Sequence, residues 1–157
     1  MMTSFAQFEK DLQKAYETKV ENVVNRFFKD IVITLYGYIT VNSEVTGGVF
    51  GSPVLTGRFY SSHNVSLNTI DTSVKPPNPA GAKSPYPQLS LSNALAVLAQ
   101  WKQGDTVYIA NSLPYARKIE SGAWSMKTPA GVYIVAAEAV KVKYANGLQG
   151  IRLQVKR

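Results

Sequence analysis

The sequence predicts an α+β fold, in which a long N-terminal helix and a small, mostly antiparallel sheet are packed by two further helices. Apolar residues recur at helical spacing through residues 1–42, which predicts the long helix. Alternating apolar and polar residues at 59–68 and 105–110 predict the strands of the sheet. Capped apolar segments at 90–102 and 129–143 predict the two further helices, which we expect to pack on that sheet.

The first helix is longer than a domain of this size needs. A helix of roughly 35 residues spans about 50 Å, so we expect it to project or to pack against a neighbouring subunit. Further apolar residues widen the stripe after its midpoint, which predicts that the second half is more deeply buried than the first. Gly37 is the expected weak point. The apolar stripe consists of Phe5, Phe8, Leu12, Tyr16, Val20, Val23, Phe27, Ile31 and Leu35, and it is widened by Val24, Phe28 and Val32.

The shorter elements follow from local patterns. One parity of the 59–68 segment is read as the half-buried face of a strand, and it includes Phe59 and His63. The 90–102 helix has an expected apolar face of Leu91, Leu95, Leu98 and Trp101. A short helix at 113–121 is expected to end at Gly122, and the 129–143 helix is expected to start at Thr128-Pro129.

Two segments are predicted to lie outside the packed core of a single domain over residues 1–157. Residues 71–88 contain five prolines, which excludes regular structure and predicts an extended surface loop. Residues 147–157 form a basic tail, whose alternation of apolar and polar residues fits an edge strand or a segment ordered by a partner.

Charge is unevenly distributed along the chain. The net charge is +7, and basic and acidic residues balance through residue 42, so the whole excess lies downstream. A basic C-terminal segment indicates an acidic protein surface or nucleic acid as a partner, although a solvated tail is an equally simple interpretation. No apolar run is long enough for a membrane span, so no membrane partner is expected.

The sequence offers little catalytic chemistry. It has no cysteine and one histidine, His63, which excludes thiolate chemistry and leaves His63 to be interpreted as a structural or surface residue. The ten acidic residues suggest no catalytic pair, and Gly47-Gly48-Val49-Phe50-Gly51 lacks the lysine and spacing of a phosphate-binding loop. We therefore expect no enzyme activity, no metal site and no cofactor. For Glu120, the simplest interpretation is an acid on a helix surface.

Several short motifs occur in a recognisable order. They are Thr56-Gly57-Arg58-Phe59, then Val107-Tyr108-Ile109-Ala110-Asn111, then Pro114-Tyr115-Ala116 with Glu120-Ser121-Gly122, then the segment from Ala123 to Gly131. In this order the chain resembles the neck and tail-completion proteins of long-tailed bacteriophages, which include relatives of the lambdoid minor tail protein Z. The resemblance covers most of the chain. It departs from the family pattern at residues 71–88 and after Gly147.

The resemblance implies a structural virion protein. It implies a cyclic homo-oligomer, with sixfold symmetry, in the neck or at the top of the tail, located in the virion at the head–tail junction after assembly in the host cytoplasm. Its partners would be the adjacent head-closure or connector protein and the tail-tube or terminator protein, with non-specific DNA contact as the DNA passes.

A small basic protein that binds nucleic acid without sequence specificity is the alternative, because tyrosines are interleaved with basic residues. Tyrosine and arginine are equally enriched at protein interfaces. The candidate interface or fold-critical residues are Arg58, Tyr115, Arg117, Glu120, Lys141, Lys143, Arg152, Lys156 and Arg157.

Overall fold

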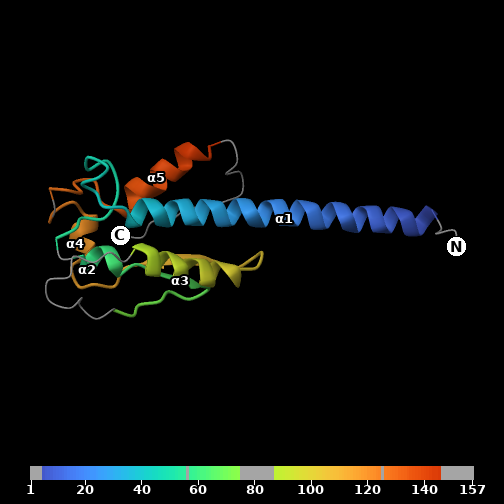
Figure 1. Ribbon diagram of the computed structural model, residues 1–157, viewed down its shortest axis with the longest axis horizontal. Coiled ribbons are helices and arrows are strands. Elements are labelled where there is room, and N and C mark those ends of the chain that lie inside the picture. The colour runs from blue at the N-terminus through green and yellow to red at the C-terminus, as the bar shows by residue number, and fades with distance from the viewer. Residues whose placement is uncertain (1–4, 56, 75–86, 125, 146–157) are drawn as a thin grey trace.

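The computed structural model describes residues 5–55, 57–74, 87–124 and 126–145 (Figure 1). The predicted α+β fold is confirmed: a long N-terminal helix, a two-stranded antiparallel sheet and further helices are present in the described residues. The elements are α1 (Phe5–Thr40), α2 (Arg58–Ser61), β1 (Asn64–Leu67), α3 (Pro87–Ala99), β2 (Val107–Ala110), α4 (Ala116–Glu120) and α5 (Tyr133–Lys143).

Helix α1 runs along the long axis of the molecule. In Figure 1 it lies between α5 and α3, and its N-terminal half extends well beyond both. The helix continues through Gly37, contrary to the expected weakness there. The reason is packing: Tyr36 and Ile39 on either side of Gly37 are fully buried, and this burial outweighs the low helix propensity of one glycine.

Two aromatic contacts mark the place where α1 leaves the body of the protein. Phe27 meets Tyr144 edge to face at the end of α5, with ring centroids 5.6 Å apart. Phe28 stacks on Trp101, just after α3, with centroids 4.2 Å apart. Aromatic pairs of this kind add to the apolar area they bury, so the two contacts hold α1 between α5 and α3.

The sheet is shorter than predicted. β1 and β2 pair antiparallel, with Val65 opposite Ile109, and α3 packs against β1. The strand predicted from residue 59 is wrong in its first part, because residues 58–61 form the helical turn α2. Phe59 is buried in the core, and its carbonyl oxygen accepts a hydrogen bond from the Asn111 side chain at 2.9 Å, which fixes this turn.

Three helices differ from their predicted bounds. The helix predicted at 113–121 begins only at Ala116, and the helix predicted at 90–102 ends at Ala99. α3 begins at Pro87, inside the segment expected to be loop, and proline suits a first helical position. Its buried side includes Ala94 and Leu98, whereas Leu91 and Leu95 are exposed, which corrects the predicted face. α5 begins at Tyr133 and not at Pro129, for a reason that involves Glu120 and is described below.

The main apolar core joins α1 to the segments around α4 and α5. It consists of Ile39, Phe59, Leu113, Ile119, Val132 and Ala136. Most of the predicted 71–88 loop and all of the predicted 147–157 tail lie outside the described residues.

Candidate functional site

A long exposed apolar surface lies on the N-terminal half of α1. Every residue from 7 to 24 is exposed, and the first half-buried position is Asn25. The prediction that the second half of the helix is more deeply buried is therefore confirmed. Leu12, for example, is 59% exposed, whereas Ile31 is 1% exposed. The exposed apolar residues of this half, here called the α1 stripe, are Phe8, Leu12, Tyr16, Val20, Val23 and Val24.

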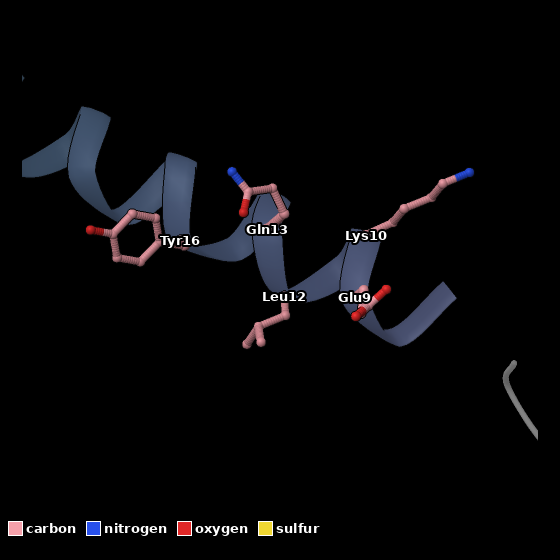
Figure 2. A pocket seen from close by; sticks show the side chains of 5 residues that line it. All are labelled: Glu9, Lys10, Leu12, Gln13 and Tyr16. Carbon is pink, nitrogen blue, oxygen red and sulfur yellow. The ribbon is translucent and has the colours of Figure 1, made fainter. Parts of the chain in front are cut away.

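A shallow depression lies on the same part of the helix. Its five lining residues, Glu9, Lys10, Leu12, Gln13 and Tyr16, all come from α1. Figure 2 shows Leu12 projecting from one side of the helix and Lys10 and Gln13 from the other. A hollow formed by one helix cannot enclose a small molecule on several sides, as substrate pockets do. The surface is better suited to contact with another protein element.

A second group of exposed apolar residues lies at the opposite end of the molecule, in two loops that meet there (Figure 1). The loops are held together by an ion pair between Lys127 and Glu44. We call this group the loop-end surface. It consists of Val45, Val49 and Leu55 from one loop and Trp124 and Met126 from the other.

Glu120 is a buried structural acid. It is 9% exposed, so its interpretation as a surface acid is wrong. Its carboxylate accepts hydrogen bonds from the backbone N–H groups of Val132, Tyr133 and Ile134, at 2.9, 3.0 and 3.0 Å. These groups belong to the first turn of α5, where no N-cap side chain bonds the backbone. Glu120 thus caps a helix twelve residues downstream, and its charge complements the positive end of the helix dipole.

The backbone around Glu120 is packed so closely that two glycines are required. A Cβ atom on Gly131 would lie 2.6 Å from the Glu120 carbonyl oxygen, and one on Gly122 would lie 2.1 Å from that of Pro129. Both glycines have positive φ angles, which side chains disfavour. The Glu120-Ser121-Gly122 and Pro129-Ala130-Gly131 motifs are therefore two halves of one packed unit. This unit explains why α5 starts after Gly131.

A series of buried hydrogen bonds links α1 to α5 through Ser52 and through His63, which directly precedes β1. Tyr133 Oη lies 2.7 Å from His63 Nδ1, and His63 Nε2 lies 2.9 Å from Ser52 Oγ. Ser52 donates its only hydroxyl proton to the Ile39 carbonyl at 2.7 Å, so Nε2 of His63 must donate to Ser52. Nδ1 of a neutral His63 then accepts from Tyr133. Burial, with a further contribution from the Glu120 charge, raises the pKa of Tyr133 well above its ordinary value, which keeps this donor protonated.

The Ser52–His63 pair resembles the nucleophile–base pair of a hydrolase only in the distance between the hydroxyl oxygen and the ring nitrogen. Ser52 is 0% exposed and His63 is 1% exposed, so in this conformation a substrate cannot reach the hydroxyl oxygen. The other ring nitrogen contacts a tyrosine and not a carboxylate, unlike the usual triad. The arrangement fits a structural role, in which each buried polar atom finds a partner.

The remaining candidate residues do not form one site. Tyr115 is half-buried and packs edge to face on Trp124, with centroids 5.2 Å apart, and burial raises its pKa while the Arg58 charge opposes the rise. Arg117 is exposed on α4. Tyr115 thus links the core to the loop-end surface through Trp124.

Lys141 and Lys143 lie on the last turn of α5, far from Tyr115 and Arg117 in the sequence. Both are exposed; Lys141 pairs with Glu138 at 2.5 Å, and Lys143 lies over the Tyr144 ring, 5.0 Å from its centroid. Arg152, Lys156 and Arg157 lie outside the described residues.

Sequence reasoning missed the role of Glu120 and the Ser52–His63–Tyr133 chain. One local signal pointed to the first: the segment before α5 offers Val132 at the N-cap position, which cannot cap a helix. The second had no local signal, because its three residues are far apart in the sequence.

No cluster of three or more potential metal ligands occurs among the described residues. None of the helices within the described ranges is both long and apolar enough to cross a bilayer. Comparison of the chain with protein families, with curated proteins and with solved structures gave no match.

Proposed function

We propose that this chain is a structural protein of a tailed-phage virion that forms a ring in the neck or at the top of the tail, joins head connector to tail tube and lets DNA pass. The observation that carries the proposal is the uncovered α1 stripe on a helix that extends about 30 Å beyond the body. Exposed apolar patches on a folded chain mark contact sites. A ring subunit needs such surfaces for its neighbours.

Two further observations support it. The loop-end surface lies at the opposite end of the molecule from the α1 stripe, which suits a protein that contacts separate neighbours. The motifs that carry the resemblance to neck and tail-completion proteins also have a physical basis here. Glu120, Gly122, Pro129 and Gly131 form one packed unit that positions α5. A motif that the fold requires is stronger support for a family resemblance than a short sequence that matches by chance.

The alternative is sequence-independent nucleic-acid binding, and the charge distribution disfavours it for the body. All ten acidic residues lie in the described ranges, whereas five of the seventeen basic residues, Lys75, Lys83, Arg152, Lys156 and Arg157, lie outside them. The described part is therefore close to neutral. Binding to duplex DNA depends mainly on positive charge facing phosphates.

Native mass spectrometry and negative-stain electron microscopy of the purified full chain test the proposal. We expect closed rings with one uniform subunit number. We also expect the protein to bind duplex DNA only weakly. A monomer that binds duplex DNA, with an affinity that falls steeply between low and high salt, would favour the nucleic-acid-binding alternative.

A further inference from the structure

The structure indicates what kind of partner packs on the α1 stripe. It continues the buried face of the same helix: Phe27 is covered by Tyr144, and the stripe begins one helical turn earlier, at Val23. From there to Phe8 no other described element covers it. A helix of this length gains most of its stability from packing and not from intrinsic propensity, so an uncovered half is marginal alone.

The charges beside the α1 stripe identify the partner. Successive residues of a helix are turned by about 100°, which places the charged residues beside the stripe on two flanks. One flank carries Glu9, Glu17 and Glu21, and the other carries Asp11, Lys19 and Arg26. One flank is thus acidic, and the other has a net positive charge. A second copy of the same helix carries the complementary charges.

The arrangement of these flanks also sets the direction of the second copy. When two identical helices pack in parallel about a rotation axis, the acidic flank of each faces the basic flank of the other. In an antiparallel pair each flank faces its own equivalent, so the acidic flanks of the two helices would face each other. Exposed ion pairs add little affinity, but like charges suppress wrong orientations.

We propose that the α1 stripe is a self-association surface, on which α1 of a second copy of this chain packs in parallel and in register. Parallel packing about a twofold axis along the helices places both bodies at the same end of the pair. The inference deepens the proposed function by naming a contact between two copies of the subunit. Only the role of this contact in a ring rests on the proposed function. The exposed stripe and the charges on its flanks support the pairing of two α1 helices by themselves.

Sedimentation equilibrium of the full chain tests the surface. In Leu12→Glu/Val20→Glu, two charges are placed on the stripe, and we expect the dissociation constant for self-association to rise about 100-fold or more. The matched control is Thr18→Glu/Asn22→Glu. It adds the same charge to exposed positions on the far side of the helix and is expected to associate like the parent. Circular dichroism of each variant shows whether the body stays folded.

Disulfide trapping tests the orientation, and the absence of cysteine from the chain makes it clean. In Leu12→Cys, oxidation should give nearly complete covalent dimer, because parallel, in-register packing brings the two identical positions together. Thr18→Cys, on the far side, should stay monomeric on denaturing gels. Phe8→Cys mixed with Val20→Cys should give less mixed dimer than either variant gives with itself.

The outcomes separate this proposal from the proposed function. A parent chain that stays monomeric at about 100 μM, or a Leu12→Glu/Val20→Glu variant that associates like the parent, overturns the pairing. Preferential trapping of Phe8→Cys with Val20→Cys overturns the parallel orientation. If the stripe variant still forms the parent's rings in electron micrographs, the ring stands without this interface. If the parent pairs through α1 but never closes a ring, the pairing stands and the proposed function is wrong.

Discussion

The two halves of α1 carry apolar residues at the same helical spacing, but the protein covers only one of them. From Phe27 to Thr40 the helix is clamped between α3 and α5, and Ile31, Tyr36 and Ile39 are almost completely buried. From residue 7 to 24 every position is exposed. The same pattern therefore serves folding in one half and, in our proposal, assembly in the other. Periodicity in a sequence shows that a face will be covered, but not by which chain.

The body is held by devices that are independent of the exposed half. Glu120 caps α5, and the two glycines permit the close backbone contact. The Ser52–His63–Tyr133 hydrogen bonds link α1 to α5 through His63, which directly precedes β1. Disrupting these should unfold the body, whereas changes in the exposed half should alter association alone. The following predictions test this division.

The largest effect is expected for Glu120→Ala. It removes the acceptor of three backbone N–H groups at the start of α5, so the free energy of unfolding should fall by about 4 kcal/mol. Urea denaturation followed by circular dichroism measures it. Glu120→Gln keeps one acceptor oxygen and should cost roughly half as much, and Lys118→Ala on the exposed side of α4 should cost little. Equal midpoints for Glu120→Ala and the parent would show that the cap is not needed.

A pair of truncations compares the two halves of α1 directly. Ile31→Ala should lower the free energy of unfolding by about 3 kcal/mol, because Ile31 is buried in the body. Leu12→Ala, measured at a dilution where the chain is monomeric, should change it by less than about 0.5 kcal/mol. Comparable losses for both variants would mean that the exposed half is covered within the monomer, and the comparison would fail.

Tyr133→Phe tests the buried hydrogen-bond chain. It leaves His63 Nδ1 without its donor, which should cost about 1–2 kcal/mol of stability in urea denaturation. Tyr16→Phe is the matched control, since the Tyr16 side chain is exposed on α1, and it should leave stability unchanged. A Tyr133→Phe protein as stable as the parent would place the Tyr133 hydroxyl outside the network that holds the fold.

The smallest effect is a loss of stability at alkaline pH. Burial raises the pKa of Tyr133, so the folded state keeps its proton where the unfolded chain loses it. This contribution is complete below the ordinary tyrosine pKa of about 10 and is lost as pH rises above it, by on the order of 1 kcal/mol at pH 11. Urea midpoints at pH 8 and pH 11 measure it. Tyr133→Phe should lose less stability over this interval, and an identical loss would assign the effect to other groups.

The sequence was sufficient for those parts of the fold that depend on local pattern. The length of α1, its unequal burial and the strand at 107–110 follow from periodicity, because burial of one face imposes the repeat. The first part of the strand predicted at 59–68 is wrong because residues 58–61 form a helical turn that buries Phe59. A single buried residue has no period that would distinguish a turn from a strand. The role of Glu120 depends on backbone groups twelve residues away, which only the tertiary fold brings near. For the same reason, the sequence could not show that Ser52 and His63 meet.

Hydrogen–deuterium exchange at two protein concentrations tests the central claim most directly. Amides of residues 7–24 should exchange rapidly in dilute solution and become protected when the protein is concentrated enough to associate, while those of residues 31–40 stay protected at both concentrations. This result would show that the exposed half of α1 is stabilised by another copy of the chain. The account would be contradicted if residues 7–24 exchanged equally fast at both concentrations while sedimentation showed that the concentrated sample associates.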